Sequence, residues 1–266
     1  MRLQGVDKRE WVRGADAEEA ALRRYFRAVL GDQQTGDRMV SALLPRIART
    51  QDEDRSGLVG LFAAATRAWR MCHVHNGARM FSARLILEVL PPTRALARQA
   101  GVMVDVFGFT VDEAASVLNR SPGEVVRLLG ATRTQRRNRI GQAVLVVEDE
   151  PLIAAHLAGL ARFEGASHVA TAASYDAAIA AAAQRRPDIV ICDYDLGEGG
   201  TGVDVLRKLT AEHDCETLFV TAYPEAVLTG SDGEPAFIIG KPFADDVIRA
   251  ALHYAASAER PVLLAA

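Results

Sequence analysis

The chain has 266 residues and a mass of 28.7 kDa, which is enough for two domains that each bury a core. Its first ten residues lack the apolar run of a signal peptide and no later run has the length of a membrane span, so we expect a cytoplasmic protein without a membrane partner. The three cysteines, Cys72, Cys192 and Cys215, are an odd number without close spacing, and we expect reduced thiols.

The formal net charge of -3 hides a division between two halves of the chain. Residues 1–140 carry 23 Lys and Arg against 15 Asp and Glu, a net charge of +8, whereas residues 141–266 carry 8 against 19, a net charge of -11. A basic half joined to an acidic half favours an intramolecular interface, and it also favours an acidic partner for the basic half. Two independently solvated surfaces are the alternative interpretation.

Helical periodicity dominates the first 90 residues, after a polar N-terminal extension at 1–16. Apolar residues that recur three and four positions apart predict helices at 17–30, 37–50, 57–75 and 82–89. We expect loops at 32–36 and 52–55, and we expect Pro45 to bend or shorten the second helix.

A second helical region, residues 91–132, follows the break made by Pro91 and Pro92. A helical run at 93–107 precedes two helices, and each of these two begins with a capping-box pattern, at 110–113 and at 121–124. Two capped helices joined by a short turn are typical of a helix-turn-helix.

The second helix of this motif is a poor reader of DNA bases. It begins Glu-Val-Val-Arg-Leu-Leu at 124–129, whereas base recognition needs basic and amide side chains in the first turns. These residues suit a protein-binding face better. The basic cluster from Arg133 to Arg139 is interpreted as part of a charged linker at 133–142, with nucleic-acid binding as the competing use.

Four apolar segments in the second half each end in a polar residue. The segments lie at 144–147, 189–192, 217–220 and 237–240, and the residues that follow them are Glu148 with Asp149, Asp193, Thr221 and Lys241. Continuous apolar runs predict strands of a parallel sheet that is buried on both faces, and such sheets bind ligands at the carboxyl ends of their strands. Acids that face one another there repel unless a divalent cation lies among them, and oxygen ligands favour Mg²⁺.

These strand ends make residues 143–257 resemble the receiver domain of response regulators. The resemblance implies an α/β flavodoxin-like fold with a five-stranded parallel sheet, and a sensor histidine kinase or phosphotransferase as phosphodonor. It implies that Asp193 is the phosphoacceptor, that Thr221 and Lys241 hold the phosphoryl oxygens, and that Mg²⁺ is bound by Glu148, Asp149, Asp193 and the backbone carbonyl of Asp195. A metal, a lysine and a hydroxyl around a nucleophilic carboxylate supply the charge stabilisation that phosphoryl transfer needs.

Two features depart from the usual receiver pattern. The loop that follows Asp193 is rich in glycine and lacks the usual proline. Ile238 stands where receivers usually carry an aromatic switch residue, and Tyr223, two residues after Thr221, is a candidate to take over that coupling. Simple surface packing of Tyr223 is the alternative.

The whole chain from residue 17 onwards resembles the PhyR-type general stress response regulators. The segments that carry the resemblance are 21–31, 108–118, 219–225 and 228–230. It implies an all-α N-terminal part with sigma region 2-like helices at 17–90 and a region 4-like helix-turn-helix at 91–132, then the linker, the receiver at 143–257 and a C-terminal tail at 258–266.

The resemblance also implies a function. Phosphorylation of Asp193 would release the sigma-like part to sequester an anti-sigma factor of the NepR type, which frees an extracytoplasmic-function sigma factor. The receiver would promote only its own phosphorylation and dephosphorylation, so the protein would not be an enzyme, and direct DNA binding is not expected. A phosphorylation-controlled DNA-binding regulator or a working sigma factor is the alternative, and a phosphate sink with a vestigial helical half is a third possibility, against which the well-formed caps argue.

Overall fold

The computed structural model describes residues 15–31, 33–49, 57–75, 92–135, 140–197, 200–222, 224 and 235–257. The chain divides into two compact units between Thr134 and Gln135. We call the described residues up to Thr134 the helical unit and those from Gln135 onwards the receiver unit. Among the helices described, none is both long and apolar enough to cross a membrane.

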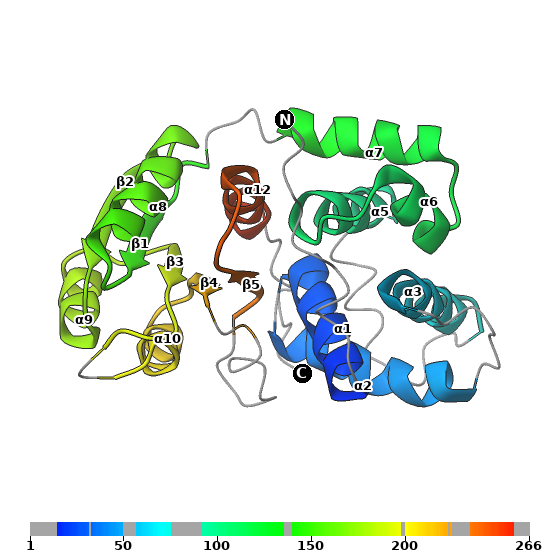
Figure 1. Cartoon of the computed structure of the whole chain (residues 1–266), viewed down its shortest axis with the longest axis horizontal. Helices are drawn as coiled ribbons and strands as arrows, with labels where there is room; N and C mark the ends of the chain where they lie inside the picture. Colours follow the sequence, from blue (N-terminus) through cyan, green and yellow to red (C-terminus); the bar gives the residue numbers. More distant parts are fainter. Residues whose placement is uncertain are drawn as a thin grey trace, which may run out of the picture. The chain divides into compact units, whose positions relative to one another are not determined.

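The helical unit consists of helices that enclose an aromatic core. Its elements are α1 (Ala15–Leu30), α2 (Gln33–Arg49), α3 (Gly57–His75), α5 (Pro92–Gly101), the π-helix η1 (Val102–Val106), α6 (Val111–Leu118) and α7 (Pro122–Gln135) (Figure 1). Tyr25 lies at the centre of the core, and its ring centroid is 4.8 Å from that of Phe62 and 6.0 Å from that of Phe107. Phe26 packs edge-to-face on Trp69, at 5.4 Å. These contacts join α1, α3 and the residue that ends η1.

A buried ion pair closes the turn between α1 and α2. The Arg27 side chain is fully buried, and its Nε and Nη2 atoms each donate a hydrogen bond of 2.7 Å to a different carboxylate oxygen of Asp37. The two helices approach so closely that a Cβ at Gly36 would lie 2.7 Å from the Cγ atom of Arg27. Glycine is therefore required at this crossing.

Two arginines tie the two helical regions to each other. Arg98 of α5 donates hydrogen bonds to the carbonyl oxygen of Ala28 in α1, with a shortest distance of 2.9 Å, and Arg70 of α3 donates to the carbonyl oxygen of Leu118, the last residue of α6. The carbonyl of Leu118 has no partner within its own helix, so Arg70 acts as a cap for α6. The helices of the two predicted helical regions thus share one core.

The predicted helix-turn-helix is confirmed by α6 and α7. Thr110 and Glu113 form a complete capping box at the start of α6, and Asn119 ends that helix in the left-handed conformation with φ 49°. Ser121 and Glu124 cap α7 in the same way, with a hydrogen bond of 2.9 Å from the Ser121 N–H to the Glu124 carboxylate. The local sequence therefore determines both helix starts.

One predicted loop in the first helices was wrong, and of the two effects expected of Pro45, a bend or a shorter helix, the shortening does not occur. The expected loop at 32–36 is helical from Gln33, because the residues before Gly36 contain no helix breaker and the Arg27–Asp37 pair holds this turn against α1. Pro45 does not shorten α2, which continues to Arg49. Its neighbours Leu43 and Ile47 are buried, so packing offsets the one hydrogen bond that proline removes.

Three further boundaries differ from the sequence analysis. Helix α1 begins at Ala15, inside the predicted extension. The linker was expected from Arg133, but α7 continues to Gln135, because Arg133 pairs with Asp105 at 2.9 Å and holds the last turn against η1. The predicted helix at 93–107 changes to a π-helix after Gly101. The helix expected at 82–89 and the loop at 52–55 lie outside the described residues.

The receiver unit is a five-stranded parallel sheet with helices on both faces, as predicted. Its elements are β1 (Ala143–Val147), α8 (Pro151–Phe163), β2 (His168–Ala172), α9 (Tyr175–Gln184), β3 (Ile189–Cys192), α10 (Gly202–Glu212), β4 (Glu216–Thr221), β5 (Phe237–Gly240) and α12 (Asp245–Ala256). The strand order is β2-β1-β3-β4-β5 and all pairs are parallel. Helices α8 and α12 pack together on one face, and α9 and α10 pack together on the other (Figure 1).

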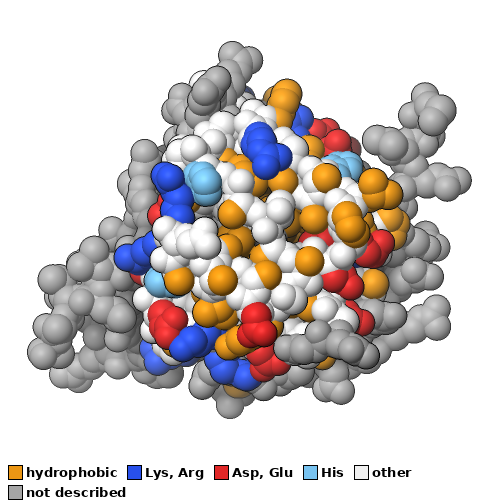
Figure 2. All heavy atoms as spheres, turned by 90° about the vertical axis from the view of Figure 1, so that its left-hand side faces the viewer, with side chains coloured by type: hydrophobic (Ala, Val, Ile, Leu, Met, Phe, Trp, Pro, Cys, Tyr) orange, Lys and Arg blue, Asp and Glu red, His pale blue; other side chains and the backbone are white. Residues whose placement is uncertain are grey.

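The strands of the receiver core carry no exposed apolar side chain, whereas helix α8 carries two large ones. All residues of β1 and β3 are buried, which explains their continuous apolar sequence. On α8, in contrast, Leu152 is 86% exposed and Phe163 is 73% exposed. Figure 2 shows the side of the receiver unit that lies on the left in Figure 1, where hydrophobic side chains are scattered over the surface and most charged side chains lie near its margin.

The buried ion pair predicts a large effect of one substitution in the helical unit. Asp37→Ala leaves the buried Arg27 guanidinium without its carboxylate, so we expect the free energy of unfolding to fall by about 3 kcal/mol. Urea denaturation followed by tryptophan fluorescence reports on this unit, because both tryptophans lie in the N-terminal half. The control is Asp112→Ala in the exposed first turn of α6, which is expected to cost less than about 1 kcal/mol. Equal losses in the two variants would contradict the assignment.

Candidate functional site

The sheet register brings the predicted site residues to one edge. Val147 lies opposite Cys192, Cys192 lies opposite Phe219, and Thr221 lies opposite Gly240. The residues that follow these positions in β1, β3 and β5 are Glu148, Asp193 and Lys241, and Thr221 itself ends β4. Their convergence follows from the parallel order of the strands, because the carboxyl ends of parallel strands meet at the same edge.

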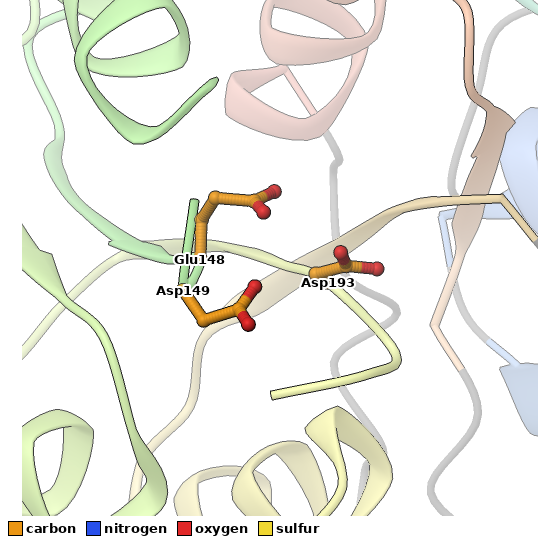
Figure 3. A group of neighbouring side chains, drawn as sticks. All are labelled: Glu148, Asp149 and Asp193. Atoms are coloured by element: carbon orange, nitrogen blue, oxygen red, sulfur yellow. The ribbon is translucent and has the colours of Figure 1, made fainter. Parts of the chain in front are cut away.

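Three carboxylates lie close together at this edge, and the side chains of Glu148 and Asp149 extend toward the side on which Asp193 lies (Figure 3). Glu148, Asp149 and Asp193 each offer one oxygen, and these oxygens all lie within 4.8 Å of one another. Glu148 and Asp193 are buried and Asp149 is exposed. A set of oxygen donors at this spacing, open to solvent on one side, has the chemistry that hard divalent cations require.

Lys241 partly balances the charge of the acids. Its Nζ atom lies 2.6 Å from Oδ2 of Asp193, and 2.9 Å and 3.1 Å from the two carboxylate oxygens of Glu148. Burial acts to lower the pKa of Lys241, but the hydrogen bonds and charges of Asp193 and Glu148 outweigh it, so the pKa lies above its usual value. The lysine is therefore an ammonium ion held between two carboxylates.

The carboxyl group of Glu148 is harder to ionise in this arrangement than in solution. Burial raises its pKa above the usual value, and this effect outweighs the hydrogen bond and the positive charge of Lys241, which lower the pKa. The negative charge of Asp193 raises the pKa further. Ionised Glu148 is thus disfavoured in the fold, and a bound cation would relieve this cost.

The glycine-rich loop after Asp193 folds back on itself. The Tyr194 N–H donates to Oδ1 of Asp193 at 2.6 Å, and Asp195 forms an antiparallel bridge with Thr201. The exposed Asp195 carboxylate accepts a hydrogen bond of 3.1 Å from the Gly197 N–H. Gly197 has φ 68°, in the left-handed region, and lies beside Asp149, because a Cβ there would be 3.7 Å from a carboxylate oxygen of that residue. The loop therefore borders the acid cluster.

The other predicted site residues divide into those that the structure places and one that it does not. Thr221 is fully buried at the end of β4, and its carbonyl oxygen accepts a hydrogen bond of 2.8 Å from the Lys241 N–H. Ile238 is buried in the core between the sheet and α9 and α10. Tyr223 lies outside the described residues, so its switch role stays a prediction.

Two residues beside the site were not identified from the sequence. Gly202 begins α10 directly against the backbone of Asp193, and Cys192 places its thiol at the same contact. A signal for the helix start was present, since Thr201 and Asp204 form a complete capping box. The contact itself depends on tertiary packing and has no local signature.

The strand order, the acid cluster, the buried threonine and the strand-end lysine together define the receiver domain of a response regulator. Sequence profiles agree, since the response regulator receiver domain matches residues 144–253 and the Sigma2 domain of PhyR matches residues 19–65. The phyllosphere-induced regulator PhyR of Methylorubrum extorquens is 32% identical over 248 residues, which cover 90% of this chain and 93% of that protein. This chain therefore belongs to the PhyR family of response regulators.

Solved structures of the family have the same fold. The response regulator PhyR from Brucella abortus superposes with a TM-score of 0.73 and 28% identity, covering 90% of each chain. A second structure, of the PhyR stress response regulator, gives a TM-score of 0.75 and 33% identity, covering 90% of this chain and 93% of that one. The similarity thus extends over both units, and the predicted fold class is confirmed.

The raised pKa of Glu148 predicts a pH dependence of stability in the absence of divalent cations. An acid whose pKa is raised by folding stabilises the fold when protonated, and this contribution is lost as the pH rises through the raised pKa. Glu148→Gln keeps an oxygen for Lys241 but cannot ionise. We therefore expect its free energy of unfolding, relative to the wild type, to increase from about pH 4 to about pH 7. Urea denaturation in EDTA, followed by far-UV circular dichroism, measures this difference, and a difference independent of pH would contradict it.

Proposed function

We propose that this protein is a phosphorylation-dependent anti-anti-sigma factor of the general stress response. Phosphorylation of Asp193 by a histidine kinase or phosphotransferase releases the helical unit to sequester an anti-sigma factor of the NepR type. An extracytoplasmic-function sigma factor is thereby freed. The observation that carries the proposal is the presence, in one chain of the PhyR family, of a sigma2-like helical unit and a receiver edge where three carboxylates meet a lysine.

Relatives support this reading. PhyR from Bartonella quintana, whose structure superposes with a TM-score of 0.73 at 27% identity, is described as an anti-anti-sigma factor. That protein has also been crystallised in complex with the anti-sigma factor NepR. By similarity, the partner of the present chain would be an anti-sigma factor of the same type.

The geometry suits Asp193 as phosphoacceptor. One carboxylate oxygen is held by the Tyr194 N–H and the other by Lys241, so the carboxylate is fixed at the edge of the sheet. In the transfer, a carboxylate oxygen attacks phosphorus and the bond to the donor's leaving group breaks, which gives an acyl phosphate on Asp193. Lys241 would then pair with a phosphoryl oxygen, and the Thr221 hydroxyl would bond to another. In this scheme the chain promotes only its own phosphorylation and dephosphorylation.

The acid cluster fits Mg²⁺. Glu148, Asp149 and Asp193, with the backbone carbonyl of Asp195, would hold the ion, which when bound supplies positive charge to the phosphoryl oxygens. Lys241 touches two of these acids, so the metal and the lysine would share their charge. The raised pKa of Glu148 supports this assignment, because it marks a site that lacks positive charge.

The opposite net charges of the two halves support control by the receiver. Phosphorylation adds negative charge at Asp193, which would alter an electrostatic association between the acidic and basic halves.

The exposed side of α7 supports a protein partner and not DNA: it presents Val126, 56% exposed, and Arg127, between glycines at 123 and 130.

The first test compares wild type with Asp193→Asn. In Mg²⁺ and acetyl phosphate we expect the wild type to bind a NepR-type anti-sigma factor 5 to 150-fold more tightly than without the phosphodonor, the range of about 1 to 3 kcal/mol typical of allosteric coupling. Asp193→Asn should show no change, because an amide cannot accept the phosphoryl group. Isothermal titration calorimetry measures both affinities. Asp176→Asn, an exposed acid on α9, is the matched control and should behave as wild type.

The same experiment also tests the competing function, which is DNA binding. Stress-promoter DNA is titrated in parallel at several salt concentrations, since phosphate contacts impose a steep salt dependence. Sequence-specific DNA binding without capture of the anti-sigma factor would overturn the proposal and favour a DNA-binding regulator. An equal gain in partner affinity for Asp193→Asn would place the switch at another residue.

The shared charge of Lys241 and the metal gives a second test. Lys241→Gln leaves two neighbouring buried carboxylates without their cation, so we expect the free energy of unfolding in EDTA to fall by about 3 kcal/mol. Saturating Mg²⁺ should raise the melting temperature of this variant more than that of the wild type. Lys208→Gln, which removes an exposed lysine paired with Glu212 on α10, is the control. Equal stabilisation of all three proteins by Mg²⁺ would show that the ion binds away from Lys241.

A further inference from the structure

The first turn of α10 lies against the backbone of the phosphoacceptor without room for a side chain. A Cβ at Gly202 would lie 1.8 Å from the carbonyl oxygen of Asp193, and 2.8 Å from the ring of Phe219. Neither neighbour is a flexible side-chain end. Phe219 is fully buried in β4, and Asp193 donates its backbone N–H to the carbonyl oxygen of Val147 at 2.9 Å. Any larger residue at position 202 must therefore displace α10 or the loop that leads to it.

Hydrogen bonds hold this contact from both sides. The Gly202 N–H donates to the carbonyl oxygen of Tyr194 at 2.8 Å. The thiol of Cys192 lies 3.2 Å from the carbonyl oxygen of Asp193 and 3.8 Å from that of Gly202. Burial raises the pKa of Cys192 well above its usual value, and the charges of Asp193 and Glu148 act in the same direction, so the thiol stays a protonated donor.

The contact also fixes where the glycine-rich loop begins and ends. Thr201 caps α10 through Asp204, with a hydrogen bond of 2.8 Å between the side chains, and it forms the antiparallel bridge with Asp195. The position of Asp195 therefore depends on the position of Thr201, which depends on how closely Gly202 approaches Asp193.

We infer that Gly202 is a positioning residue for the phosphorylation site: by lacking a side chain, it lets α10 hold Asp193 and the backbone of Asp195 where both can face one cation. The inference rests on the proposed function, which assigns Mg²⁺ to this edge. In Gly202→Ala, the sheet holds Asp193, so the displacement falls on the start of α10 and on the backbone that Thr201 bridges to Asp195. Loss of a group that orients metal ligands typically lowers metal affinity by about 10 to 100-fold. We expect Gly202→Ala to bind Mg²⁺ at least about tenfold more weakly than the wild type.

The experiment measures Mg²⁺ affinity of the full chain by isothermal titration calorimetry, and stability by urea denaturation in EDTA. Two controls separate positioning from stability. Gly159→Ala on α8 adds the same methyl group where it would meet nothing within 4 Å, and it should bind Mg²⁺ as wild type does. Leu209→Ala removes a buried side chain of α10 away from Asp193, so it should lower stability but leave Mg²⁺ affinity within about twofold.

Each outcome decides the question. Weakened Mg²⁺ binding in Gly202→Ala alone supports the inference. Equal weakening in Leu209→Ala, or wild-type affinity in Gly202→Ala, overturns it while the proposed function stands. A wild type that binds no Mg²⁺ overturns both the metal assignment and this inference. If Gly202→Ala does not fold, Thr201→Ala replaces it: loss of the side-chain cap loosens the start of α10, so Mg²⁺ should bind more weakly than to the wild type, and unchanged affinity there overturns the inference.

Discussion

The structure of the receiver unit depends on how three carboxylates are kept at one edge of the sheet. Glu148 and Asp193 are buried, and their mutual repulsion is offset by a single ammonium group, that of Lys241. The offset is incomplete, because the pKa of Glu148 remains raised. A fold that stores this repulsion is less stable than it could be, and it gains stability from any ligand that brings positive charge to the edge. The proposed cation binding and phosphorylation would therefore both gain from the same electrostatic imbalance at this edge.

Backbone packing, and not only charge, sets the geometry of that edge. The β1–β3 and β3–β4 registers place Glu148 and Asp193 side by side, but they do not determine the path of the chain after Asp193. That path is set by the contact of Gly202 with the Asp193 carbonyl and by the bridge between Asp195 and Thr201. This loop lacks the proline that is usual in receivers. Its path is fixed instead by the packing of the first residues of α10 against Asp193 and Asp195.

The sequence predicted the strands that end in site residues, because buried parallel strands are apolar throughout and their polar successors stand out. Strand β2, His-Val-Ala-Thr-Ala, lies at the sheet edge with residues partly exposed, so it has no continuous apolar run and was implied only by the resemblance. Capping boxes located α6 and α7 to the residue. The start of α2 was missed, because it depends on the pairing of Arg27 with Asp37 across a turn, and the Gly202 contact was missed because it too depends on packing that no local pattern encodes.

The helical unit uses much of its basic character internally. Arg27 is bound to Asp37, Arg98 to the Ala28 carbonyl, Arg70 to the end of α6, Arg133 to Asp105, and Arg24 lies 5.5 Å from the Phe107 ring. Arg98, Arg70 and Arg24 link the two helical regions, and these contacts compete with any use of the same guanidinium groups on a phosphate backbone. A surface that binds DNA without sequence contacts needs many free basic groups, because each phosphate contact contributes separately. The internal use of arginine, together with an outer side of α7 that presents Val126 and two glycines beside Arg127, therefore favours recognition of a protein over recognition of nucleic acid.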